Sequence, residues 1–246
     1  MSVMKMDRIA TKTMFTIGLL ILLMSVPALG ASINKSVKIA AGEESGGATS
    51  VNGSITVGKS ATVTGNLKTV NGTIRIDEGA IVKKASTVNG GLKLGDNGRA
   101  EALSTVNGSI RVGEKATVDG EIEAVNGRIT VKKGARINDN VGNVNGEIDL
   151  NGAEIGGDLS TVNGDIDLAD RSVVKGDIIV EEPGGWNSNK EKSRIPRVVI
   201  GPGSRVEGTI VLERKVKLYI SESAEVGGVS GEMSMDDAVR FSGDRP

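Results

Sequence analysis

The stretch Val51-Asn52-Gly53-Ser54-Ile55-Thr56-Val57-Gly58-Lys59-Ser60-Ala61-Thr62-Val63-Thr64-Gly65-Asn66-Leu67 is one copy of a repeat that fills most of this chain. Its leading tripeptide Val-Asn-Gly recurs at steps of eighteen or nineteen residues, starting at Val51, Val70, Val88, Val106, Val125, Val144 and Val162. A degenerate copy starts at Ile33. A unit this short cannot bury an apolar face alone, so neighbouring copies must stack into a solenoid.

The spacing of apolar residues within a copy predicts β-strands. Ile55 and Val57, and then Ala61 and Val63, are separated by single residues, and the gaps between such pairs usually contain glycine. This alternation turns every second side chain inward, and glycine permits the bends. We therefore expect an all-β fold: a single-stranded parallel β-helix of triangular section, with three short strands per coil and Val51 among the inward residues.

The same register continues beyond the last Val-Asn-Gly copy. It reappears in two further sets, which are Val198, Ile200, Ser204, Val206, Gly208 and Ile210, and then Leu218, Ile220, Ala224, Val226 and Gly228. The repeat domain is thus expected to span residues 31–231 in about ten coils. At about 4.8 Å per coil, these coils would form a rod of roughly 45 to 50 Å.

The composition excludes several kinds of chemistry. The chain has no histidine and no cysteine, and it has only one tryptophan and one tyrosine. Disulfides, thiolate catalysis and cysteine or histidine metal sites are therefore ruled out. No nucleophile–base pair can be assembled, so we predict a protein that is not an enzyme and needs no cofactor. The net charge of −1 gives no reason to expect a nucleic-acid partner.

The N-terminus is typical of a signal peptide. Lys5, Arg8 and Lys12 precede a short apolar run from Met14 to Val26, and small residues follow before Ala31. Residues 1–30 are therefore predicted to be removed on export to the periplasm or the cell surface. The apolar run is short for a membrane span, which needs about 20 residues, although an uncleaved anchor is the alternative.

One segment interrupts the repeat. Residues 181–196 are polar, are bounded by proline and glycine, and contain Trp186, the only tryptophan. They are expected to form a loop extruded from the wall of the solenoid. Trp186 is the candidate interaction residue of this loop, and the alternative is a tolerated insertion whose tryptophan packs back on the wall.

The repeated asparagines fall at the same corner of successive coils. Asparagine before glycine suits a turn with positive φ, and stacked amides can hydrogen-bond from coil to coil. We expect a structural ladder of eight residues, namely Asn34, Asn52, Asn71, Asn89, Asn107, Asn126, Asn145 and Asn163. The hydroxyl residues that often precede the valine do not indicate an ice-binding row, because Ala124 and Asn143 interrupt them and no Thr-x-Thr pairing occurs.

A second column lies on the outer side of the first strand of each coil. It changes from basic residues such as Lys38 and Arg75 to acidic residues further along the chain. Four carboxylates of two adjacent coils should meet there, at spacings of about 5 to 7 Å. They form a candidate cation patch with calcium as the suitable ion, or else a solvated acidic surface: Glu147, Asp149, Asp165 and Asp167.

The two ends of the rod are expected to differ. The first coil has a polar middle between Gly42 and Gly47, so that end should be open. Residues 232–246 are predicted to form a C-terminal cap or tail, in which Met233, Met235, Val239 and Phe241 cover the last coil. An unpaired coil edge invites pairing with another chain, so self-association through the solenoid ends is expected.

Three segments of the repeat, which are Ile55 to Leu67, Ile110 to Ile122 and Val198 to Ile210, resemble the coil of bactofilins, a family of polymer-forming cytoskeletal proteins. The resemblance covers about Ile33 to Gly231. It implies a right-handed β-helix that assembles end to end into filaments without nucleotide. With the predicted export, this favours a structural or scaffolding solenoid of the bacterial envelope. The alternatives are a cell-surface adhesin or glycan-binding solenoid, and an envelope enzyme subunit without chemistry of its own.

Overall fold

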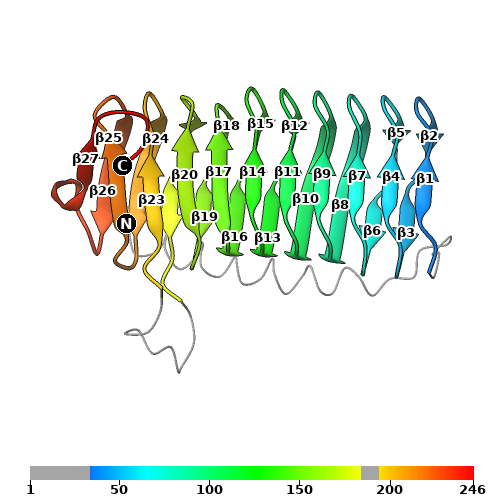
Figure 1. The fold of residues 1–246 in the computed structure, drawn as a ribbon, viewed down its shortest axis with the longest axis horizontal. Helices are drawn as coiled ribbons and strands as arrows, with labels where there is room; N and C mark the ends of the chain where they lie inside the picture. Colours follow the sequence, from blue (N-terminus) through cyan, green and yellow to red (C-terminus); the bar gives the residue numbers. More distant parts are fainter. Residues whose placement is uncertain (1–33, 184–193) are drawn as a thin grey trace, which may run out of the picture.

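The computed structural model describes residues 34–183 and 194–246, which form a rod of about ten stacked coils (Figure 1). The coils follow one another along the rod in sequence order, as the gradual change of colour in Figure 1 shows. Apart from a single turn of 3₁₀ helix, η3 (Met235–Asp237), the regular elements of the described residues are strands, and their ladders are parallel. The predicted all-β parallel solenoid is confirmed.

One wall of the rod, here called face 1, is an 11-stranded sheet. At about 4.8 Å between strands, this face is about 48 Å long. It consists of one strand from each coil and the added C-terminal strand β27: β1 (Val37–Ile39), β4 (Ile55–Val57), β7 (Ile74–Ile76), β9 (Leu92–Leu94), β11 (Ile110–Val112), β14 (Ile129–Val131), β17 (Glu147–Asn151), β20 (Asp165–Ala169), β23 (Arg197–Ile200), β25 (Lys217–Ser221) and β27 (Val239–Phe241).

The other two walls form a 16-stranded sheet, because four long strands continue from one wall to the other: β8 (Ile81–Asn89), β10 (Arg99–Asn107), β24 (Arg205–Leu212) and β26 (Glu225–Gly231). Face 2 also contains β2 (Glu44–Ser45), β5 (Thr62–Val63), β12 (Thr117–Val118), β15 (Arg136–Ile137), β18 (Glu154–Ile155) and β21 (Val173–Val174). Face 3 also contains β3 (Ala48–Ser50), β6 (Leu67–Thr69), β13 (Ile122–Asn126), β16 (Val141–Asn145), β19 (Leu159–Thr161) and β22 (Ile178–Val180).

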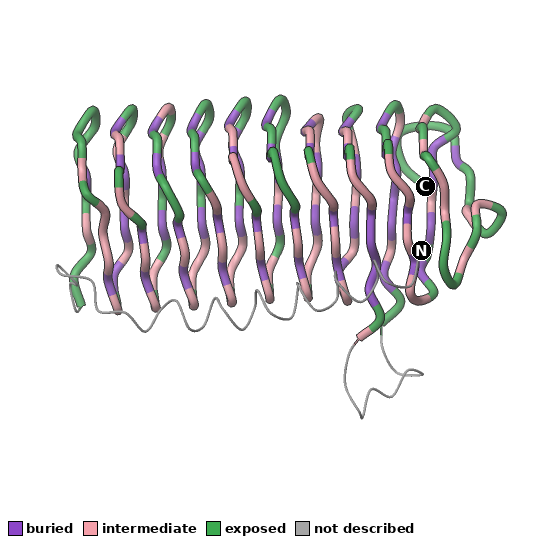
Figure 2. Tube along the Cα trace, turned by 180° about the vertical axis from the view of Figure 1, so that it is seen from behind, coloured by how far each residue is buried: buried purple, intermediate pink, exposed green. Residues whose placement is uncertain are grey.

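The core consists of columns of aliphatic side chains, one from each coil. The first inward residue of the face 1 strands is at most 2% exposed in nine successive coils, namely Ile55, Ile74, Leu92, Ile110, Ile129, Ile148, Ile166, Val198 and Leu218. Figure 2 shows these buried positions recurring along the whole rod. Each fully buried side chain of this size contributes about 1.5 to 3 kcal/mol, so the core needs no aromatic centre.

The predicted register of the C-terminal coils is confirmed on face 1, whereas on β24 and β26 a register shift after Val206 pairs Gly228 with Thr209 and not with the expected Gly208. Val198 and Ile200 pair with Ile166 and Leu168, and Leu218 lies beside Val198. The segment that separates these coils was predicted as the loop 181–196. Its residues 184–193, including Trp186, lie outside the described residues, as does the predicted signal peptide.

Two details at the Val-Asn-Gly corner differ from the prediction. The valine is only half-buried, and the residue before it points inward instead, as with Thr69, Thr87 and Thr105, which are at most 1% exposed. In addition, of the eight ladder asparagines only Asn34 has a positive φ, 60°. The corner therefore selects asparagine for its side chain and not for a left-handed backbone.

The glycine of the corner is required because two coils approach each other closely there. A Cβ on Gly108 would lie well inside van der Waals contact of the Gly90 carbonyl oxygen, and Gly72, Gly90 and Gly146 meet the preceding coil in the same way. The stacking distance between coils leaves no room for a side chain here. Glycine is thus required by the close approach of two backbones.

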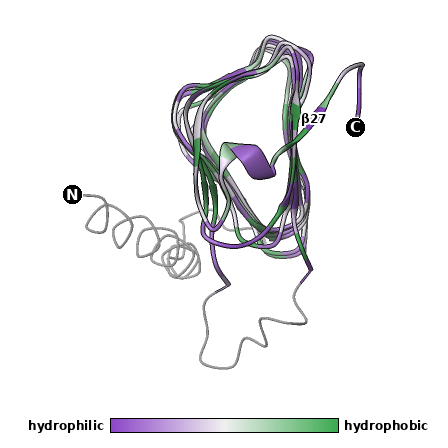
Figure 3. Cartoon of the chain, turned by 90° about the vertical axis from the view of Figure 1, so that its left-hand side faces the viewer, coloured by the Kyte–Doolittle hydropathy of each residue, from purple (hydrophilic) through white to green (hydrophobic). Residues whose placement is uncertain are grey.

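The ends of the rod differ, as predicted. Figure 3 views the C-terminal end and shows the short helix lying across it. Met233 and Met235 pack against the core and Phe241 is 9% exposed, but Val239 is 54% exposed and does not belong to the cover. Both Val239 and Phe241 lie on β27, which joins face 1 as an added strand. At the other end, the first coil contains a short strand, β2, where we expected only a polar gap, and no described strand pairs with the outer edges of β1, β2 and β3.

Replacing Gly108 with alanine should destabilise the rod by at least about 2 kcal/mol, because the added methyl group overpacks the corner. Gly142→Ala is the matched control, since its Cβ would lie an ordinary 3.4 Å from Ser160 Oγ. Urea denaturation monitored by circular dichroism measures both variants. Equal midpoints for the two variants would contradict the close-approach explanation.

Candidate functional site

The eight predicted ladder asparagines form one continuous chain of hydrogen bonds. In every step the Nδ2 of one asparagine donates to the Oδ1 of the asparagine in the preceding coil, from Asn52 to Asn34 at 2.6 Å up to Asn163 to Asn145 at 3.0 Å. All the amide dipoles therefore point the same way along the rod, and such aligned chains polarise one another.

The ladder ends on an arginine that the sequence analysis did not identify. Arg214 donates from Nη1 to Asn163 Oδ1 at 3.0 Å and to the Val162 carbonyl at 3.2 Å, and from Nη2 to the Arg194 carbonyl at 3.0 Å. Asn163 Oδ1 is the acceptor end of the ladder, where the aligned dipoles place partial negative charge. A guanidinium group is the suitable terminus for it.

A second, inner column supports the same corner. The hydroxyl groups of Thr69, Thr87 and Thr105 donate to the corner carbonyl of the preceding coil at 2.8 to 3.0 Å. Asn143 replaces the threonine in one coil and donates to Gly127 O at 2.7 Å, which leaves its buried Oδ1 without a hydrogen-bond partner. These side chains point into the rod and make hydrogen bonds there, so they cannot form a hydroxyl surface.

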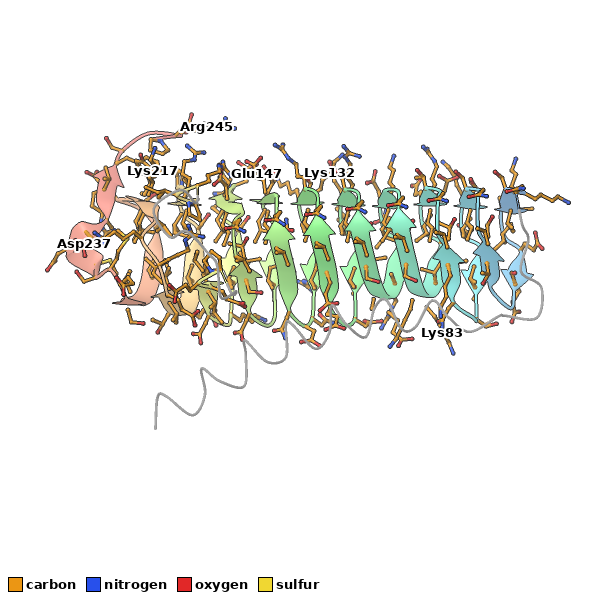
Figure 4. The ribbon with its side chains drawn as sticks, turned by 90° about the horizontal axis from the view of Figure 1, so that it is seen from below. Lys83, Lys132, Glu147, Lys217, Asp237 and Arg245 are labelled. Carbon is orange, nitrogen blue, oxygen red and sulfur yellow. The ribbon has the colours of Figure 1, made fainter. Side chains whose placement is uncertain are left out.

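The four predicted carboxylates are brought together on face 1. Glu147 pairs in register with Asp165, and Asp149 with Asp167, on strands β17 and β20. Figure 4 shows Glu147 on the long edge of the rod that also carries Lys132 and Lys217. The side chains are partly buried, and that of Asp149 is 18% exposed.

Arginines pair with these carboxylates. Arg128, one coil earlier, contacts both Glu147 and Asp149, the latter at 3.4 Å. Arg194 reaches Asp165 at 2.5 Å, and Arg197 reaches Asp167 at 3.4 Å. The backbone N–H of Arg197 also donates to Asp165 at 2.8 Å. Arginines therefore provide positive charge at this patch.

No metal geometry emerges from this arrangement. Among the residues that the structure describes, no group of three or more histidine, cysteine, aspartate or glutamate side chains is placed to hold a metal ion. The arginines beside Asp165 and Asp167 come from the C-terminal flank of the predicted loop. Arg194 and Arg197 therefore hold this flank against the preceding coil.

The arginine beside Asp149 does not fully offset the effects that raise the pKa of this carboxyl group. Burial, followed by the neighbouring Glu147, raises the pKa of Asp149 to about 7, although Arg128 acts in the opposite direction. Burial also raises the pKa of Asp167. Stacking carboxylates on adjacent coils therefore costs free energy of folding, and the arginines offset this cost only in part.

No helix within residues 34–183 and 194–246 has the length and apolar character needed to cross a membrane.

Replacing Asn107 with leucine should lower the free energy of unfolding by about 1 to 3 kcal/mol, because Asn89 Oδ1 loses its donor and Asn126 Nδ2 its acceptor. Asn66→Leu is the control, since Asn66 is an exposed asparagine outside the ladder. Chemical denaturation of both variants provides the measurement. An Asn107 variant as stable as the control would show that the ladder contributes nothing to stability.

The raised pKa of Asp149 predicts a stability that falls with rising pH. The folded protein holds this proton more tightly than the unfolded chain, so stability decreases from the ordinary carboxyl pKa of 3.8 up to about pH 7. Asp149→Asn should flatten this part of the pH profile and make the protein more stable than wild type at pH 8.

Thermal unfolding between pH 4 and pH 8 tests this expectation. An Asp119→Asn variant removes an exposed, paired carboxylate elsewhere and should keep the part of the profile that comes from Asp149. A wild-type profile for the Asp149 variant would be the contrary result.

Comparison with models of known protein families, with curated proteins and with solved structures found no match.

Proposed function

We propose that this protein is an exported, non-enzymatic scaffold of the bacterial envelope that self-associates through its N-terminal coil. The observation that carries the proposal is the difference between the two ends of the rod. Within the described residues, strands at both ends lack a partner on their outer edges, β1, β2 and β3 at one end and β26 and β27 at the other. The core of the last coil is in addition covered by Met233, Met235 and Phe241, whereas no described side chain covers the core of the first coil in this way.

The hydrogen bonds of the first coil identify the groups that would pair. Val37 N–H donates to Ser54 and Ile39 C=O accepts from Gly58, so both residues face the second coil. Because backbone groups alternate in direction along a strand, the N–H and C=O of Lys38 point to the outer edge. An edge of this kind pairs readily with another chain.

Two N-terminal edges would meet in such an association. The C-terminal cover opposes addition at the other end, so this geometry favours pairs of rods. Long filaments of the type implied by the bactofilin resemblance would require displacement of residues 232–246.

Replacing Lys38 with proline should abolish the association, since proline removes the outward N–H without touching the bonds to the second coil. Lys38→Gln is the matched control, because it removes the same charge and keeps the N–H. Light scattering coupled to size exclusion and negative-stain microscopy, on protein beginning at Ala31, should show dimers for wild type and Lys38→Gln and monomers for Lys38→Pro.

Deleting residues 233–246 in the same protein should instead lengthen the assemblies, because it uncovers the last coil. If wild type and the truncated form both remain monomeric at high concentration, the scaffold proposal fails and the adhesin or glycan-binding alternative takes its place.

A further inference from the structure

A polar pocket of about 900 Å³ lies on one corner of the rod, between face 1 and face 2. Corner residues of four successive coils line it, and the C-terminal tail closes one side. Figure 4 shows the tail bent back toward the middle of the rod, with Arg245 above the edge that carries Glu147 and Lys132. This volume suits a ligand the size of a small oligosaccharide.

Three cationic side chains line the pocket together with two carboxylates, Asp170 and Asp244. Lys133, Arg171 and Arg245 take part in none of the ion pairs among the described residues. Lys59, on the same corner nearer the N-terminus, is paired with Glu78 at 3.0 Å. None of the three pocket cations is held in such a close ion pair, and Arg245 lies near enough to Asp167 to lower the pKa of that carboxyl.

The stems of two of these cations rest on glycines of the following coil. A Cβ on Gly152 would lie 3.2 Å from Lys133 Cγ, and a Cβ on Gly203 would lie 2.7 Å from Arg171 Cγ. Both glycines have positive φ, 63° and 65°. Glycine therefore leaves room for the two long side chains to lie along the corner and into the pocket.

The backbone at the centre of the pocket is strained. Asp170 and Arg171 are consecutive and both have positive φ, 53° and 62°, whereas each of the other left-handed residues other than glycine in the described chain stands alone. A left-handed conformation is unfavourable for a residue with a Cβ, because the Cβ crowds the following carbonyl oxygen. Strain of this kind is often retained where it places side chains for a function.

The remaining polar groups define the class of ligand. Asp170, Asp244 and Asn151 lie beside the cations and supply acceptors for hydroxyl groups, and no aromatic side chain lines the pocket. We propose that the pocket binds an acidic sugar, whose oxyanion is held by Lys133, Arg171 and Arg245 and whose hydroxyls are held by the acidic and amide groups. Arginine suits this role because its planar guanidinium matches carboxylate and phosphate oxygens. The site goes beyond the scaffolding function, since its lining is far from the first coil.

Isothermal titration calorimetry at low salt tests the proposal with digalacturonate, glucose 6-phosphate and neutral cellobiose. At least one of the two anionic sugars should bind and cellobiose should not, and which of them binds distinguishes a carboxylate from a phosphate ligand. Arg171→Gln and Arg245→Gln should each weaken binding at least tenfold. Arg111→Gln, on face 1 three coils before Arg171, should bind like wild type.

Circular dichroism confirms that each variant is folded, and Arg245 lies in the tail, where its replacement leaves the coils intact. Absence of heat with both anionic sugars would overturn the proposal. Equal weakening by Arg111→Gln would do so too, because it would show a general effect of surface charge and not a site.

Discussion

The stacking of coil on coil at one fixed spacing is the constraint on which the rest of this structure depends. With each coil only one strand thick, every residue meets the equivalent residue of the next coil in the parallel register. Isoleucine therefore packs on isoleucine in the core, asparagine bonds to asparagine at the corner, and glycine lies beneath a backbone carbonyl. The Val-Asn-Gly repeat is therefore the sequence of a corner whose residues must pack against the same residues in the next coil.

The same constraint makes charge difficult to place. A carboxylate on the outer side of a strand faces a carboxylate if the next coil repeats it, as Asp149 faces Asp167. Arginines of neighbouring coils pair with these carboxylates: Arg128 of the preceding coil pairs with Asp149, and Arg197 of the coil after the interruption pairs with Asp167. Burial, and after it the neighbouring Glu147, raise the pKa of Asp149 by more than Arg128 lowers it.

The asparagine ladder gives the rod a polarity along its axis. Each amide donates toward the N-terminal end, and the acceptor end meets Arg214, which also holds the described flank of the interruption through the Arg194 carbonyl. The ladder thus ends where the regular repeat ends. Beyond it, the rod is completed by coils without the asparagine and by the tail that forms the wall of the acidic-sugar pocket.

The repeat by itself determined the parallel solenoid, the stacking of Asn107 on Asn89 and the meeting of four carboxylates, because a strict period carries each residue onto its equivalent in the next coil. It did not determine which side chain turns inward at the corner, where the backbone path places Thr105 inside and Val106 half outside. Nor did it reveal the arginine contacts. Arg214 reaches Asn163 across 51 residues and Arg194 reaches Asp165 across 29, after the interruption has shifted the period. Only the folded chain decides such contacts, because long side chains reach between coils that the repeat does not relate.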